Sequence, residues 1–303
     1  MRAAALALLV LLAPATAAAY RTSEDSLFNQ RAGIVGRIAF EPLPVPYAIF
    51  RASSDVPEDE LRAATLRAFQ TWTEPACSAL TIRDDGTTTT PGIYGDDQNV
   101  IEWVESGWTG HGFGSGTIGV TTNQFLGSGG VWSIDESDML LNGEDFRWVI
   151  EGGEPDADPV DVQGLVVHEA GHFLGLLHPC EQIANDGAPA CPTFTETPTM
   201  APIYTGEEQR TLTADDVAGI CYLYPAPVMP DAGVDGGAPA SDAGPTGLDP
   251  GIVATDAGTP ADAGAPPDDP GCSCRAARPE TPPPAWALLG LALVAGLRSA
   301  RRR

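Results

Sequence analysis

Lysine is absent from the 303-residue sequence, and histidine occurs only four times. Arginine therefore supplies all 16 basic residues, which face 41 acidic residues and leave a formal net charge of −25. Because such a surface repels phosphate backbones and anionic lipid head groups, we exclude nucleic acid as a partner. The charge suits calcium or a cationic substrate, but a solvated acidic surface needs no ligand to explain it.

Apolar runs long enough for an ordinary membrane-spanning helix are also lacking, since a bilayer requires about 20 residues. The first run, Ala3–Ala13, follows the basic Arg2 and precedes the small residues Ala17-Ala18-Ala19. This order is typical of a secretory signal peptide, so we assign residues 1–19 to one that is cleaved before Tyr20. We therefore expect a secreted protein, which reaches a compartment where disulfides form.

Six cysteines are present, and four of them fall in the region that we expect to fold. Cys180 and Cys191 bracket one loop, whereas Cys77 and Cys221 lie at the ends of the first and last expected helices. We predict the disulfides Cys180–Cys191 and Cys77–Cys221, although four cysteines allow three pairings and the sequence does not choose among them.

The segment HEAGHFLGLLH contains three histidines and one glutamate, at His168, Glu169, His172 and His178. A four-residue spacing on a helix places the first two histidines on one face, so both rings can reach one ion. Gly175 allows the sharp turn that returns the third histidine. Three protein ligands leave one zinc position for water, and Glu169 can act on that water as general base.

This motif, H-E-x-x-H-x-x-G-x-x-H, resembles that of the metzincin zinc endopeptidases. Met200 follows the last histidine in the segment PTMAPIY, and the resemblance implies that it forms the methionine turn beneath the metal. The order M-x-P-x-Y is similar to the matrixin branch, the matrix metalloprotease type. That similarity implies that Pro202 and Tyr204 line the pocket for the first side chain after the cut. An ordinary core methionine is the alternative for Met200.

The sequence also departs from the matrixin pattern. Pro179 replaces the usual serine and is closer to the serralysin branch, but the Gly-rich calcium-binding repeats of serralysins are missing. Only His111 remains to serve a second, structural zinc, so we expect one catalytic zinc alone. No PRCG-type cysteine switch precedes the domain, so latency by a thiol on the zinc is not expected.

The resemblance covers residues 45–225 and implies an α/β (α+β) fold of the metzincin type. It has a twisted mixed sheet, an active-site helix and a small C-terminal subdomain, with the zinc in the groove between them. Periodicity and turn signals predict helices ending at Trp72, at 161–174 and at 213–222. They predict strands at 44–50, 79–83, 100–104, 117–122 and 138–141. The resemblance implies that the strand at 138–141 is the antiparallel edge to which an extended substrate adds.

Residues outside this domain have other expected roles. Residues 20–44 form an N-terminal arm or a short inhibitory segment, and residues 226–271, rich in Asp, Ala, Gly and Pro, form a disordered linker. Residues 272–303 contain a Cys-Ser-Cys motif, a short hydrophobic helix and an arginine cluster. This order resembles the C-terminal sorting tails of myxobacteria, which implies display at the cell surface or outer membrane of a bacterium. A permanent weak anchor, a short transmembrane helix, is the alternative.

We therefore expect a secreted, monomeric zinc endopeptidase that cleaves protein or peptide substrates. One alternative is a catalytically silent adhesin or binding module on the same scaffold, and another is a hydrolase of non-protein amides. Calcium stays open, because acidic turn residues also bond to their own backbone. The candidates are Asp84-Asp85-Gly86, Gly95-Asp96-Asp97 and Asp135-Glu136-Asp138.

Overall fold

The computed structural model describes residues 20–92, 95–153, 158–194, 196–227 and 272–275. The expected signal peptide at 1–19, nearly all of the linker and the short hydrophobic helix of the tail lie outside these residues. None of the helices in the described part of the chain is long and apolar enough to cross a membrane.

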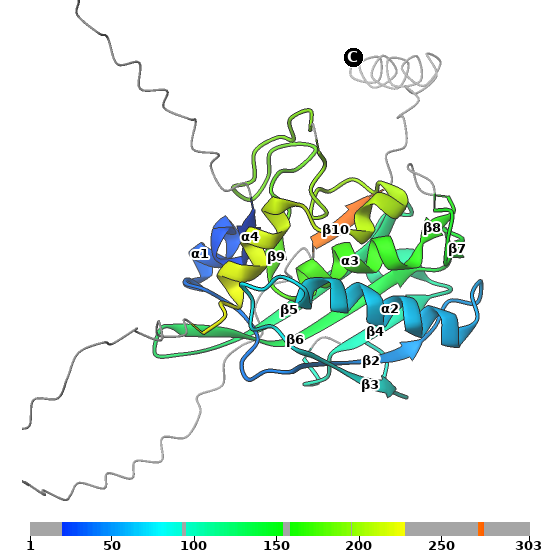
Figure 1. The fold of residues 1–303 in the computed structure, drawn as a ribbon, viewed down its shortest axis with the longest axis horizontal. Coiled ribbons are helices and arrows are strands. Elements are labelled where there is room, and N and C mark those ends of the chain that lie inside the picture. Colours follow the sequence, from blue (N-terminus) through cyan, green and yellow to red (C-terminus); the bar gives the residue numbers. More distant parts are fainter. Residues whose placement is uncertain (1–19, 93–94, 154–157, 195, 228–271, 276–303) are drawn as a thin grey trace, which may run out of the picture.

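The largest sheet of the molecule is mixed and six-stranded, with the strand order β10-β5-β6-β4-β2-β3 (Figure 1). The strands β2, β3, β4 and β6 run parallel, and β5 is antiparallel to β6. Their bounds are Val45–Arg51 for β2, Ile82–Thr87 for β3, Val100–Val104 for β4, Thr117–Ser128 for β5, Val131–Asn142 for β6 and Cys272–Arg275 for β10. The predicted twisted mixed sheet of an α/β fold is therefore confirmed.

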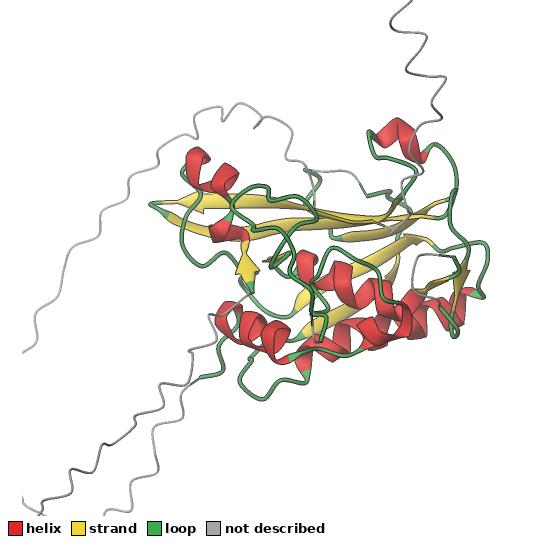
Figure 2. Ribbon diagram, turned by 90° about the horizontal axis from the view of Figure 1, so that it is seen from above, coloured by secondary structure: helices red, strands yellow, loops and turns green. Residues whose placement is uncertain are grey.

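Two long helices, α2 at Glu58–Thr73 and α3 at Val162–Phe173, pack together on one face of the sheet (Figure 2). Phe69 of α2 meets Phe173 of α3 edge to face, with ring centroids 5.3 Å apart. The indole N–H of Trp72 donates to the carbonyl of Val167 at 2.8 Å. These buried aromatic contacts fix α3 against a rigid support, because large rings contribute much of the apolar area that folding removes from water.

Individual residues determine where α3 begins and where it ends. At its N-terminus the Asp161 carboxylate accepts the backbone N–H of Gly164 at 2.5 Å, as an N-cap does, and it is paired with Arg210. Beyond its C-terminus Gly175 adopts φ +103°, where a Cβ would lie 3.0 Å from the carbonyl oxygen of Ile38. Glycine is therefore required at the turn that redirects the chain into the C-terminal subdomain.

The C-terminal subdomain contains α4, Ala214–Leu223, and the short strand β9, Leu176–Leu177. The Cys77–Cys221 disulfide joins it to the segment after α2, and Cys180–Cys191 closes the loop after β9, so both predicted pairings are confirmed. Short elements complete the fold: η2 at Trp108–His111, β7 at Trp148–Val149, β8 at Val160–Asp161 and η3 at Gly206–Arg210.

The N-terminal arm packs on the C-terminal subdomain. It contains β1 at Arg21–Thr22, η1 at Ser23–Asp25 and α1 at Leu27–Ala32. Strand β1 pairs with β9 in antiparallel register, and the N–H of Ser23 donates to the carbonyl of Gly175 at 3.0 Å. The arm therefore supports the segment that follows α3.

The predicted edge strand is wrong. Residues 138–141 belong to β6, which lies between β4 and β5, and they are buried in the sheet. Within the expected catalytic domain, 45–225, the edge next to α3 is β5, which contains the predicted strand 117–122; β10 of the tail pairs with it. Periodicity identifies strands, but it says nothing about their lateral order, which depends on pairing between distant segments.

Candidate functional site

Three buried imidazoles converge at the junction of the two subdomains. The Nε2 atoms of His168 and His172 lie 3.2 Å apart, and that of His178 lies 3.2 Å and 3.0 Å from them, respectively. Helix α3 aligns the first two by its one-turn spacing, and the turn at Gly175 returns the third. In the described part of the chain this is the one group of three or more histidine, cysteine or acidic side chains arranged to hold a metal ion.

Each ring places its second nitrogen, Nδ1, against an oxygen. Nδ1 of His168 lies 2.6 Å from the carbonyl oxygen of Thr199, and Nδ1 of His172 lies 2.9 Å from that of Leu176. Nδ1 of His178 lies 2.8 Å from a carboxylate oxygen of Glu181. An Nδ1–H that donates to oxygen leaves the Nε2 lone pair for a metal, so all three rings favour the ligand tautomer.

The protonation state also suits metal binding. Burial lowers the pKa of His168 to about 4, and it lowers the pKa of His172 and His178 well below the ordinary range. All three rings are therefore neutral at pH 7, as ligation requires. Tetrahedral zinc with Zn–N bonds of 2.0–2.1 Å separates its nitrogen ligands by about 3.3 Å, close to the observed spacing. The donor set fits zinc.

Glu169 follows the first ligand on α3 and lies against the edge strand β5. Its Oε2 accepts the hydroxyl of Thr121 at 2.7 Å. A Cβ at Gly119 would lie 2.7 Å from Glu169 Oε1, so the strand approaches the carboxylate this closely only because position 119 carries no side chain. The carboxylate is thus fixed between the imidazole cluster and a strand edge.

Met200 is buried beneath α3. A Cβ at Gly171 would lie 2.1 Å from the Met200 sulfur, so the methionine fills the space that this helix residue leaves. The carboxylate of Asp216, at the start of α4, accepts the N–H groups of Thr199 at 2.9 Å and Met200 at 3.1 Å. Because the Thr199 carbonyl contacts His168, this turn connects α4 to the first imidazole.

The two predicted pocket residues occupy different positions. Pro202 lines a cavity of about 850 Å³ that also borders His178, Thr121 and Asn123. Tyr204 does not line that cavity: it is buried, and its hydroxyl accepts the N–H of Asp161 at 2.5 Å. Its position supports the start of α3, while a role in an S1′ wall stays a prediction.

The remaining candidates lie away from the imidazole cluster. His111 is exposed at the end of η2 and stacks on Phe113. The acidic calcium candidates have partners within the protein: Asp84 pairs with Arg62, and Glu136 accepts the N–H of Gly95 at 2.6 Å. Calcium binding therefore stays a prediction without a ligand set.

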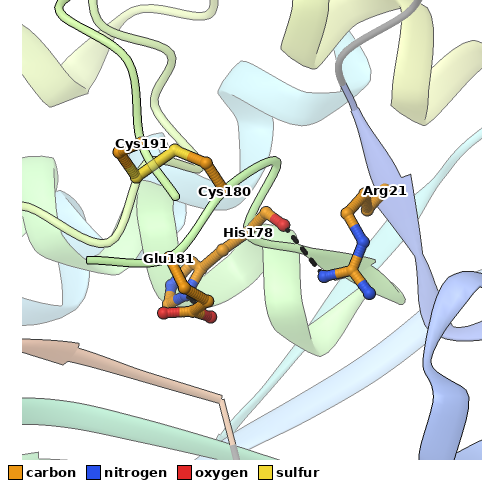
Figure 3. Close-up of a disulfide and its surroundings, with 5 residues drawn as sticks. All are labelled: Arg21, His178, Cys180, Glu181 and Cys191. Atoms are coloured by element: carbon orange, nitrogen blue, oxygen red, sulfur yellow. Dashed lines mark hydrogen bonds and ion pairs between the residues drawn. A yellow bond between two sulfur atoms is a disulfide. The ribbon is translucent and has the colours of Figure 1, made fainter. Parts of the chain in front are cut away.

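Three positioning residues escaped the sequence analysis: Thr121, Glu181 and Asp216. Glu181 lies beside the His178 ring, and the guanidinium of Arg21 reaches the backbone carbonyl of His178 at 3.3 Å (Figure 3). The position of Glu181, three residues after a proposed ligand, could have indicated its contact with His178. Nothing local marks Thr121, because its contact with Glu169 spans 48 residues.

Comparison with known proteins agrees with this geometry. The family model described as Matrixin matches residues 39–225. Metalloendoproteinase 2-MMP of Arabidopsis thaliana is 29% identical over 181 residues, covering 55% of this chain and 38% of that protein. Metalloendoproteinase 5-MMP of the same plant is 31% identical over 116 residues, covering 38% and 27%, respectively. The matched regions thus span well under half the length of these relatives.

Proposed function

The chain belongs to the matrixin family, and on that premise we propose that it is a secreted zinc-dependent endopeptidase that cleaves extended protein substrates. The observation that carries this proposal is the convergence of three neutral, buried imidazoles beside the Glu169 carboxylate. The matched plant proteins are named metalloendoproteinases, which supports the same reaction class.

His168, His172 and His178 would hold the zinc through their Nε2 atoms. Zinc, when bound there, supplies a Lewis acid that acidifies a water and polarises a carbonyl. Glu169 accepts the proton that the attacking water loses, and it returns this proton to the leaving nitrogen of the peptide. The Thr121 hydroxyl holds one oxygen of this carboxylate, which limits the rotation of the side chain and keeps it beside the imidazoles.

The edge of β5 supplies the orientation of the substrate. An extended peptide that adds to this edge is held by backbone hydrogen bonds, which place one peptide bond beside Glu169 whatever its side chains are. Specificity then comes from the flanking cavity, to which Pro202 contributes. This arrangement favours a peptide chain over a small amide, since a small amide offers no backbone to pair.

The deciding experiment measures zinc content and peptide-library cleavage for the wild type, Glu169→Gln and Glu60→Gln. We expect all three to bind one zinc, and Glu169→Gln to lose a factor of about 10²–10⁴ in rate, the usual contribution of a positioned base. Glu60 is an exposed carboxylate of α2, so its variant controls for the lost charge. Full activity in Glu169→Gln would show that another group is the base.

The same experiment tests the adhesin alternative. One zinc per chain with no cleavage of any peptide by the wild type would favour a binding module on a peptidase scaffold. The intact Glu169 opposes that alternative, because a silent module has no need of a base held beside the ligands.

We also propose the domain organisation and location that the sequence indicates. A signal peptide at 1–19, a catalytic domain over 45–225 and a linker over 226–271 would place a bacterial enzyme outside the cytoplasm. Residues 272–303 would then attach it to the cell surface. Two disulfides support an oxidising compartment. N-terminal sequencing of the exported protein checks the expected start at Tyr20, and cell fractionation checks the tail.

A further inference from the structure

The edge of β5 is paired in this structure with a distant segment of the same chain. Strand β10, Cys272–Arg275, runs antiparallel to β5 and begins far beyond the end of the catalytic domain (Figure 1). Its register pairs Cys272 with Thr121, Cys274 with Gly119 and Arg275 with Thr117. Four residues of the tail therefore cover the N-terminal half of the edge strand.

This part of the edge strand is also the part that contacts the proposed base. Thr121 donates to the carboxylate of Glu169, and Gly119 is the residue that lets the strand approach it. Strand β10 also comes within 8 Å of α3, measured between Cα atoms. The tail backbone therefore lies along the edge strand and close to α3, where the proposed function places the substrate.

Protection of an exposed edge is an alternative role, since unpaired strand edges promote aggregation. However, β10 leaves the C-terminal half of β5, residues 123–128, outside its register, although β5 continues there in a hairpin with β6. A segment that served only to cover the edge would be expected to extend along it. The pairing is instead confined to the stretch beside Glu169.

We propose that Cys272–Arg275 is an intramolecular occupant of the β5 edge from Thr117 to Thr121. The tail segment competes with substrate through backbone pairing, so the enzyme is latent while the segment is bound. The latency rests on the proposed function, whereas the pairing of β10 with β5 does not. Tethering favours the competitor, because a segment of the same chain binds in an intramolecular step and does not pay the entropic cost of association.

Hydrogen exchange tests the pairing without any need for catalysis. The full chain would carry Glu169→Gln to prevent self-cleavage, alone or combined with Ser273→Pro, which removes a backbone donor from the centre of β10. We expect the β5 amides over 117–121 that face away from β6 to exchange about tenfold faster in the proline variant. Ala254→Pro, a proline placed in the linker sequence instead, should leave exchange unchanged.

A variant without the two thiols separates backbone pairing from ligation by cysteine. The double substitution Cys272→Ser and Cys274→Ser keeps every backbone group of β10, so β5 should stay as protected as in the parent. Equal exchange in the parent and in Ser273→Pro would overturn the proposal. Loss of protection in the double serine variant, to the level of Ser273→Pro, would also overturn it, because thiols would then hold the segment.

Activity assays then test latency. With Glu169 intact, Ser273→Pro should raise kcat/KM for an unstructured peptide about tenfold, mainly through a lower KM, while Ala254→Pro should not. If no variant cleaves any peptide while the exchange difference persists, the proposed function fails and the pairing stands. If all variants cleave at one rate, the latency fails and the peptidase stands.

Discussion

The two halves of the imidazole cluster are built in different ways. His168 and His172 come from α3, where helical spacing alone aligns them, whereas His178 comes from an irregular segment that side-chain contacts stabilise. The Glu181 carboxylate, the Cys180–Cys191 disulfide and the Arg21 guanidinium all act on that segment. A regular element thus secures part of a site by its backbone spacing, while the rest depends on separate side-chain contacts that can be changed one at a time.

The helical half should tolerate no loss of a ligand. We expect His172→Ala to lose bound zinc and to reduce peptide cleavage to the level of the chelated wild type, because two imidazoles hold zinc far more weakly than three. Metal analysis and a cleavage assay on the purified protein measure this. His111→Ala, which removes the exposed histidine, should keep both zinc and activity. A zinc-loaded His172→Ala protein would contradict the ligand set.

The junction between the halves can be tested at one glycine. Gly175→Ala should lower the free energy of unfolding by about 3 kcal/mol or more, because it adds left-handed strain and brings a Cβ to 3.0 Å from the Ile38 carbonyl. Gly152→Ala carries the same strain at φ +83° but meets no atom within 4 Å, so it should cost about 1–2 kcal/mol. Urea unfolding at pH 7 measures both, and equal losses would mean that the turn adapts.

The loop half should respond in a graded way. We expect Glu181→Ala to weaken zinc binding about 10–100-fold, the usual effect of removing a carboxylate behind a ligand. Glu181→Gln should fall between this variant and the wild type, since the amide oxygen still accepts the His178 Nδ1–H. Competition with a fluorescent chelator measures the affinities, with Glu151→Ala as the exposed control. Wild-type affinity in Glu181→Ala would show that Glu181 is not needed to position His178.

A substitution in the sheet should have a smaller, pH-dependent effect on the free energy of unfolding. Burial, together with the nearby Glu136, Asp96 and Glu102, raises the pKa of Asp138 to about 7, while Val100 N–H donates to its Oδ1. A carboxyl with a raised folded pKa contributes most stability below about pH 4, and this contribution is lost as pH rises towards 7. Asp138→Asn should therefore be about 1 kcal/mol more stable than the wild type at pH 8. Urea unfolding at pH 4.5 should show no such gain in stability. A gain of the same size at both pH values would contradict the titration of Asp138.

Local patterns in the sequence predicted the histidines that converge in the imidazole cluster. The ligand spacing, Glu169 and the turn at Gly175 depend on neighbours within one helix and one turn, so a motif captures them. Both disulfides were predicted from cysteine positions, and the mixed α/β fold from the matrixin resemblance. Zinc occupancy and the individual catalytic roles stay predictions, which the experiments above address.

The residues that position this site were predicted less well. The choice of 138–141 as the edge strand failed because lateral strand order depends on pairing across the sheet; β6 is an inner strand, and β5 and β10 lie outside it. Asp216 caps α4, and it also holds the turn that contains Met200. Thr121 was one residue of a predicted strand with no individual role. Each of these contacts joins segments between 16 and 48 residues apart.

The buried Tyr204 hydroxyl has a consequence for protein engineering. It accepts the N–H of Asp161, the residue that caps α3 and pairs with Arg210. Replacing Tyr204 to alter selectivity would therefore disturb the start of the helix that carries two imidazoles, and turnover would fall for every peptide. Pro202, which borders the cavity, is the better position for a saturation library, because changes there leave the helix cap intact.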